Sequence, residues 1–172
     1  MNIDWSDLKY TGTQQTHCMV LAKILLALYK SDESIIGIEI GVQNGSTSFY
    51  LLDNIPNLTL YGIDNAPCLD HIKEHGGYEK AVKDKRFRLI TDISDKAVKQ
   101  FKPQSMNFVW VDGDHSYEQC KKDIENYLPI TKKFIGGHDY GVDAWPGVTQ
   151  AVDEAFGDRV NVMSDLTWMV EL

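Results

Sequence analysis

Glu39-Ile40-Gly41-Val42-Gln43-Asn44-Gly45-Ser46 lies where an apolar run, residues 35–40, turns into a segment with helical character. A turn that binds phosphates needs closely spaced glycines, as in G-x-G-x-x-G, or the lysine of a P-loop. The spacing here is E-x-G-x-x-x-G, and its acidic residue would repel a phosphate but attract an ammonium group. The turn therefore predicts a ligand with a ribose and positive charge but no phosphates, a description that S-adenosylmethionine fits.

The chain on both sides of this turn alternates between short apolar runs and amphipathic segments. Strands are predicted at residues 35–40, 59–63, 87–91, 106–111 and 134–137, with helices at 14–30, 46–54, 67–83, 94–101, 117–127 and 147–156. This alternation predicts a parallel sheet covered on both faces. Two further strand candidates, 160–163 and 167–171, flank a tight turn at Ser164-Asp165. We therefore expect an α/β fold: a Rossmann-like, doubly wound, mostly parallel seven-stranded sheet with a C-terminal antiparallel hairpin.

Length and composition predict a single domain over residues 1–172, with an N-terminal lid segment and helix in 1–30 and the core in 35–172. The net charge of −8 argues against binding to nucleic acid or to anionic membranes. Three scattered cysteines, without metal-ligand spacing, predict reduced thiols in a cytoplasmic protein. The apolar segment 19–29 is too short to span a bilayer.

Acidic residues stand at the carboxyl ends of four predicted strands, where open α/β sheets bind their ligands. These residues are Glu39, Asp64, Asp92 and Asp112. Asp64 ends the second strand, where a carboxylate can accept hydrogen bonds from both ribose hydroxyls. Asp92 ends the third strand, where the adenine amino group would lie. The alternative is that each aspartate caps the helix that follows it, and the series rather than any one member favours a ligand site.

The densest polar cluster is Val-Asp-Gly-Asp-His-Ser-Tyr-Glu at residues 111–118, followed one strand later by Gly-Gly-His-Asp-Tyr-Gly at 136–141. Asp112 and Asp139 should face each other across one cleft, and two converging carboxylates suit Mg²⁺. His115 lies close enough to Asp112 to act as a general base on a hydroxyl group held there. The alternative is that Asp114 or Ser116 caps the next helix while His115 points into solvent.

Two further residues near this cluster have no assigned chemistry. A histidine at position 138, buried in the sheet, would commonly be satisfied by a backbone partner. Trp145 lies in the loop after Asp139, where it would form a wall of the acceptor pocket or pack on the helix after it.

With these motifs in order, the sequence resembles the class I S-adenosylmethionine-dependent methyltransferases. It is most similar to small bacterial and phage-type members related to the catechol-type and antibiotic-sugar O-methyltransferases. The resemblance rests on Ile-Glu-Ile-Gly-Val-Gln-Asn-Gly-Ser, Tyr-Gly-Ile-Asp, Val-Asp-Gly-Asp-His-Ser-Tyr-Glu and Gly-Gly-His-Asp-Tyr, with Pro-Gly-Val and Ala-Val-Asp-Glu-Ala-Phe downstream.

The resemblance implies S-adenosylmethionine as cofactor and Mg²⁺ as a further candidate. It implies cofactor-binding positions at Glu39, Gly41, Gly45, Ser46, Asp64 and Asp92, metal ligands at Asp112 and Asp139, and catalytic roles for His115 and Asp112. The catechol-type enzymes carry a second oxygen ligand directly after the aspartate that matches Asp139. This chain has Tyr140 there, so Asp114 is the alternative source of a ligand. The only lid available is 1–16, and a homodimer could complete the acceptor pocket.

Three functions remain open at this point. The leading hypothesis is O-methylation of a small hydroxylated acceptor, with a sugar as one option and Mg²⁺ assistance as another. A non-catalytic S-adenosylmethionine-binding or assembly module of the same fold is the alternative. A dinucleotide-dependent oxidoreductase is disfavoured by the lack of G-x-G-x-x-G and by the terminal hairpin.

Overall fold

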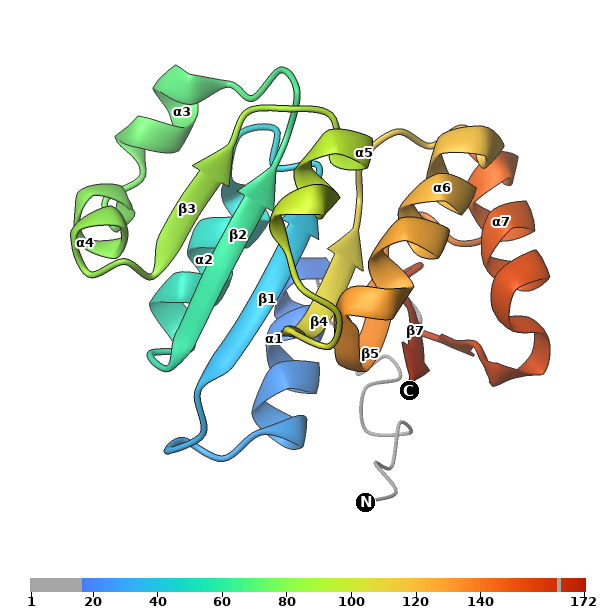
Figure 1. Ribbon diagram of the computed structural model, residues 1–172, viewed down its shortest axis with the longest axis horizontal. Coiled ribbons are helices and arrows are strands. Elements are labelled where there is room, and N and C mark those ends of the chain that lie inside the picture. The colour runs from blue at the N-terminus through green and yellow to red at the C-terminus, as the bar shows by residue number, and fades with distance from the viewer. Residues whose placement is uncertain (1–16, 164) are drawn as a thin grey trace.

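The computed structural model describes residues 17–163 and 165–172, and its centre is one seven-stranded sheet (Figure 1). The strands are β1 (Ile35–Ile40), β2 (Leu58–Ile63), β3 (Phe87–Ile90), β4 (Met106–Val111), β5 (Thr131–Gly137), β6 (Asn161–Val162) and β7 (Trp168–Glu171). Their order in the sheet is β3-β2-β1-β4-β5-β7-β6. β1 to β5 pair in parallel, whereas β7 runs antiparallel to both β5 and β6. The predicted α/β fold and its terminal hairpin are confirmed.

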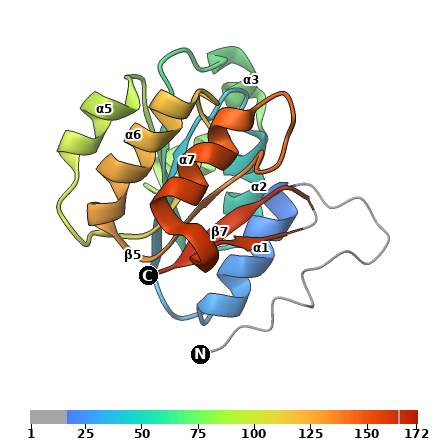
Figure 2. The ribbon, with the colours of Figure 1, turned by 90° about the vertical axis from the view of Figure 1, so that its right-hand side faces the viewer.

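Helices cover both faces of the sheet (Figure 2). They are α1 (His17–Leu28), α2 (Ser46–Asn54), α3 (Leu69–Glu74), α4 (Tyr78–Lys83), α5 (Ser94–Ala97), α6 (Tyr117–Tyr127) and α7 (Pro146–Phe156). One hydrophobic core joins α1 to α4 with one face of the sheet, and a second core joins α5, α6 and α7 with the other. This two-sided cover explains why β1 and β4 are almost continuously apolar.

Packing within the first core depends on a glycine in β1. A Cβ atom on Gly37 would overlap the ring of Phe108 in the neighbouring β4. Phe108 in turn stacks on Phe134 of β5, with ring centroids 5.3 Å apart. The glycine therefore lets a large aromatic side chain lie flat across the central strands, where its burial stabilises the fold by about 2–3 kcal/mol.

Two predicted helices differ from the structure. The helix predicted over 67–83 is divided into α3 and α4, because His75 takes an extended conformation and is followed by Gly76-Gly77, a pair with poor helix propensity. The helix predicted over 94–101 is α5 followed by a 3-10 turn, Val98–Gln100, which ends shortly before Pro103. The predicted start of the first helix at 14–16, the lid segment 1–16 and Ser164 of the hairpin turn lie outside the described residues.

The register of the parallel strands gathers the strand-end residues on one edge. Ile40 of β1 pairs with Ile63 of β2 on one side and with Val111 of β4 on the other. Val111 pairs with Gly137 of β5. The residue after each of these four therefore lies at the same edge of the sheet.

The described helices include none that is long and apolar enough to cross a membrane.

Candidate active site

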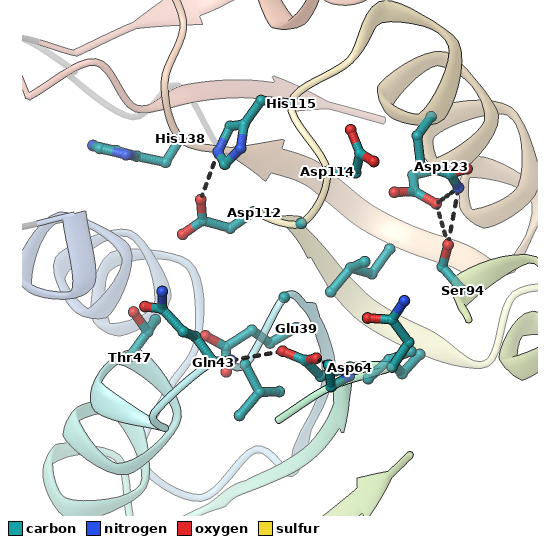
Figure 3. Close-up of a pocket in the computed structure, with 18 of the residues that line it drawn as sticks. Glu39, Gln43, Thr47, Asp64, Ser94, Asp112, Asp114, His115, Asp123 and His138 are labelled. Carbon is teal, nitrogen blue, oxygen red and sulfur yellow. Dashed lines mark hydrogen bonds and ion pairs between the residues drawn. The ribbon is translucent and has the colours of Figure 1, made fainter. Parts of the chain in front are cut away.

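A cavity of about 960 Å³ runs along this carboxyl edge. The segments that follow β1, β2, β3, β4 and β5 contribute to its walls, and His17 adds a side chain from the start of α1. Figure 3 shows side chains from separate strand ends converging on one space. Most of the residues predicted from the sequence line it: Glu39, Gly41, Ser46, Asp64, Asp92, Asp112, His115 and Asp139. Gly45 does not.

The two glycines of the first turn have different tasks. Gly41 has φ +89°, and a Cβ atom there would overlap the carbonyl oxygen of Asp112. Gly45 has φ +83° at the N-cap of α2, where a Cβ atom would lie 3.0 Å from the Phe49 ring. Gly41 thus allows the ends of β1 and β4 to approach closely. Gly45 is the residue from which α2 begins, and it does not line the cavity.

Asp64 is held rigidly at the end of β2. Its Oδ2 accepts a hydrogen bond from the Gln43 amide at 2.7 Å, and its Oδ1 accepts one from the Ala66 amide at 2.8 Å. Each oxygen keeps a further lone pair that can accept from a ligand. The backbone thereby orients a carboxylate whose remaining capacity matches a pair of adjacent hydroxyl groups.

Glu39 is a buried acid, 2% exposed, beneath the same turn. Burial raises its pKa to about 8, against a lowering contribution from the hydroxyl of Ser48, which donates to Oε2. The negative charges of Asp112 and Asp64 raise this pKa further. A cation in the adjacent cavity would offset the cost of ionising Glu39.

The far end of the cavity contains a network that sequence reasoning missed. Asp123 of α6 is 1% exposed; its Oδ1 accepts from Ser94 Oγ at 2.6 Å and from Gln119 Nε2 at 3.0 Å. Burial raises the pKa of Asp123 to about 6. The signal for this residue in the sequence was an aspartate on the apolar face of a helix, beside Ile124.

The carboxylate of Asp92 accepts a hydrogen bond from the amide of the next residue, Ile93, at 2.9 Å.

At the near end, three side chains of types that can bind a metal come together. One donor atom each from Asp112, His138 and Asp139 can be chosen so that all lie within 4.8 Å of one another. Burial raises the pKa of Asp112, with the nearby His17 opposing that shift. Asp139 has φ +62°, a left-handed conformation that costs energy for a residue with a Cβ atom. Strain of this kind commonly accompanies functional sites.

His115 points into the cavity rather than into solvent, with its side chain 26% exposed. Its Nε2 lies 2.7 Å from Asp139 Oδ2 and 3.9 Å from Asp112 Oδ1. The 2.7 Å approach is not aligned as a hydrogen bond, and Nε2 has no hydrogen-bond partner among the described residues. The ring stacks on Trp145 at a centroid distance of 4.8 Å. Trp145 therefore forms a wall of this cavity, which is one of the two positions predicted for it from the sequence.

The expected capping role at this loop falls to the neighbours of His115. Ser116 is the N-cap of α6, where its hydroxyl accepts from the Gln119 amide at 3.3 Å. Asp114 Oδ1 accepts from the Ser116 amide at 2.8 Å. Tyr140 is also engaged elsewhere, because its hydroxyl donates to Asp153 of α7 at 2.6 Å. Capping and catalytic candidates therefore alternate along one loop.

His17 is a second residue that the sequence did not single out. Its Nε2 lies 2.8 Å from Thr47 Oγ1 and 3.9 Å from Asp112 Oδ2, and its ring is 4.5 Å from that of His138. Burial lowers the pKa of His17. Nothing in the local sequence marks it, because α1 meets the strand ends only through the tertiary fold.

Comparison with known proteins shows the family of the chain. A family model for a methyltransferase domain matches residues 38–140, which is more than half of the chain and runs from the middle of β1 to the residue after Asp139. The chain belongs to this family, and its fold and strand order make it a class I S-adenosylmethionine-dependent methyltransferase. No curated protein matches it in sequence.

Solved structures show how widely the fold is shared. A Corynebacterium glutamicum protein superposes with a TM-score of 0.67 at 17% identity, covering 98% of this chain and 86% of its own. An O-methyltransferase from Bacillus cereus in complex with SAH gives 0.62 at 16% identity, covering 95% and 83%. A precorrin-6Y C5,15-methyltransferase from Geobacter metallireducens gives 0.60 at 12% identity, covering 95% and 92%. At these identities the likeness establishes the fold alone.

Proposed function

We propose that this protein transfers the methyl group of S-adenosylmethionine to a hydroxyl oxygen of a small acceptor. The observation that carries the proposal is the convergence of His115 with two carboxylates at one end of the cleft. In the reaction the sulfur–methyl bond breaks and an oxygen–methyl bond forms. The products are the methyl ether, S-adenosylhomocysteine and the proton lost by the hydroxyl. A site for this reaction needs a group that accepts the proton.

Each part of the cofactor is assigned to a different group of residues along the cleft. We assign the methionine part to the turn that contains Glu39, Gly41 and Ser46, with Gly45 shaping the turn from behind. Asp64 would accept hydrogen bonds from the ribose hydroxyls, since its oxygens are already oriented by backbone amides. Asp92 would lie beside the adenine. S-adenosylmethionine supplies an electrophilic methyl group held on a positively charged sulfur.

His115 is the proposed general base. Its imidazole faces the cleft between Asp139 and Trp145, and the Asp139 carboxylate would stabilise the imidazolium formed when the acceptor's proton arrives. Asp112 and Asp139 are the proposed metal ligands, and oxygen donors of this kind fit Mg²⁺. A bound divalent cation would lower the pKa of the acceptor hydroxyl.

A small molecule is the proposed acceptor. The net charge of −8 and the acidic residues along the cleft disfavour a polyanion such as nucleic acid. Hydroxyl groups, by contrast, can donate to carboxylates. The stacked pair of Trp145 and His115 offers a flat wall against which a ring could pack.

The proposal can be tested with S-adenosylmethionine carrying a carbon-13 methyl group. The protein is incubated with panels of catechols, sugars and other hydroxylated small molecules, and methyl signals are followed by NMR, where an O-methyl carbon is distinct from N-methyl or C-methyl carbons. We expect a new O-methyl signal with an equal amount of S-adenosylhomocysteine. Methyl signals only on nitrogen or carbon, with matching amine or carbon acceptors included in the panel, would refute oxygen as the acceptor atom.

A further inference from the structure

The side chain of His138 has a fixed orientation that its sequence position did not reveal. Its Nε2 lies 2.8 Å from the carbonyl oxygen of Asp165, in the loop before β7. A carbonyl oxygen can only accept, so Nε2 carries the hydrogen. In the neutral ring, Nδ1 is then an unprotonated nitrogen with its lone pair available to the cleft.

This lone pair has an anionic neighbour. Nδ1 of His138 lies 3.2 Å from Oδ1 of Asp139. A neutral imidazole nitrogen and a carboxylate oxygen both present lone pairs and repel each other unless a proton or a cation lies between them. The Asp112 carboxylate completes the group, and the contacts of its oxygens to His17 and His115, both 3.9 Å, are longer than hydrogen bonds. A cation bound among these three donor atoms would relieve the repulsion between them.

The supporting contact to the backbone is the arrangement expected of a metal-ligating histidine. Such a histidine usually donates its other ring N–H to a carbonyl or carboxylate, which fixes the tautomer and the ring orientation. Asp165 is itself held in a turn, where its side chain accepts from the amide and hydroxyl of Thr167 at 3.3 and 3.0 Å. The loop before β7 thus positions a residue that follows β5.

From these contacts we infer that His138 is a third metal ligand, beside Asp112 and Asp139, and that the site prefers a divalent transition metal such as Mn²⁺ over Mg²⁺. This inference deepens the proposed function, on which it rests for its role in activating the acceptor. Mg²⁺ strongly favours oxygen ligands, whereas an imidazole nitrogen adds affinity for divalent transition metals, of which Mn²⁺ also accepts carboxylate oxygens and water readily. A set of two carboxylates and one imidazole also leaves coordination positions open for water or an acceptor oxygen.

The role of Tyr140 is consistent with this ligand set. The catechol-type pattern would place an oxygen ligand after Asp139, but the Tyr140 hydroxyl donates to Asp153 at 2.6 Å. His138, on the other side of Asp139, supplies the donor atom that this position does not. The ligand pair would then be His138-Asp139 rather than Asp139 and its successor.

The test uses untagged full-length protein, since a histidine tag would bind the same metals. Calorimetric titrations with Mn²⁺ and with Mg²⁺ compare the two affinities, and pulsed electron paramagnetic resonance on the Mn²⁺ complex detects a directly bound nitrogen. We expect Mn²⁺ to bind at least about tenfold more tightly than Mg²⁺, with a nitrogen coupling typical of imidazole. Equal or stronger Mg²⁺ binding, absence of the coupling, or no binding of either metal would each overturn the inference.

A variant separates His138 from the other imidazoles in the cleft. His138→Asn should abolish the nitrogen coupling and weaken Mn²⁺ binding by about tenfold to hundredfold, while His71→Asn, on the exposed face of α3, should change neither. A coupling that persists in folded His138→Asn would assign the nitrogen to another residue and refute the inference. Circular dichroism checks that the variant is folded. If it is not, the affinity for Mn²⁺ and the nitrogen coupling measured on the wild-type protein still test the inference. Methyl transfer is measured separately, so a failed O-methylation test leaves the metal result readable.

Discussion

At the scale of single residues, the acids along the cleft differ in what surrounds them. Glu39 is buried, and its carboxyl group accepts a hydrogen bond from the hydroxyl of Ser48. Asp64 is anchored by two backbone amides. Acids of one chemical type therefore have different surroundings: Glu39 is buried and its pKa is raised, whereas Asp64 presents oxygens that backbone amides hold in place.

Glu39 should make the stability of the protein depend on pH. Its pKa is about 8 in the folded protein, against 4.5 for an unperturbed glutamate. Between these values the folded state retains a proton that the unfolded chain has lost, so stability declines as pH rises through this window. Glu39→Gln removes the titration and keeps an acceptor for Ser48. We expect the variant to gain stability relative to wild type from about pH 4.5 to pH 8, reaching on the order of 3–5 kcal/mol at most.

Urea unfolding at a series of pH values measures this difference. The exposed residue Glu125, on α6, supplies the matched control, because Glu125→Gln replaces the same kind of carboxyl group at a position in contact with solvent. Parallel stability curves for wild type and Glu39→Gln across the window would show that Glu39 does not carry the shifted proton.

His115→Gln should separate chemistry from cofactor binding. The substitution removes the proposed base but leaves the Asp64 end of the cleft intact, so kcat should fall by about 10²- to 10⁴-fold while the Kd for S-adenosylhomocysteine stays within about twofold. His71→Gln, on α3, should leave both values unchanged. Activity measured on the acceptor found in the labelling experiment gives the answer, and a variant with wild-type kcat would exclude His115 as the base.

At the scale of elements, the close approach of β1 and β4 makes one glycine indispensable. A side chain at Gly41 would meet both an unfavourable φ of +89° and the carbonyl oxygen of Asp112. Gly141 also has positive φ, +83°, but open space around it. Gly141→Ala should therefore cost only about 1–2 kcal/mol, whereas Gly41→Ala should cost more because backbone must move as well. Urea unfolding compares the two variants, and equal losses would contradict the close-contact explanation.

Sequence patterns gave reliable information about elements whose apolar spacing is regular. The bounds predicted for β1, α2, β4 and α6 match those in the structure. The division of residues 67–83 into two helices was missed, because the tertiary fold, together with Gly76-Gly77, overrides a helical pattern there.

The site was predictable only as far as strand ends could be recognised. Asp64, Asp112 and Asp139 follow apolar runs, and sheet register brings them to one edge. His17 and Asp123 come from helices, so their position in the cleft depends on how α1 and α6 pack on the sheet. The orientation of the His138 ring depends on a carbonyl group 27 residues away in sequence. No local pattern reports such contacts.

At the scale of the whole molecule, a cofactor in the cleft would join segments that otherwise meet only through the sheet. Binding to the folded state alone stabilises a protein by about 2.7 kcal/mol at a ligand concentration of 100 times Kd. For a chain of this size that should raise Tm by roughly 5–10 °C. Differential scanning fluorimetry with S-adenosylhomocysteine should show this shift, whereas NAD should give none. A shift with NAD alone would favour the oxidoreductase alternative.

The most direct measurement of the central claim is calorimetric titration of S-adenosylhomocysteine into wild-type protein and two aspartate variants. We predict one site per chain in wild type, with Kd raised about tenfold to hundredfold by Asp64→Asn, because a charged acceptor of two hydrogen bonds is lost. Asp70→Asn, an exposed aspartate in the first turn of α3, should bind as wild type does. No binding to wild type, or equal binding to the Asp64→Asn variant, would contradict the assignment of this cleft as the cofactor site.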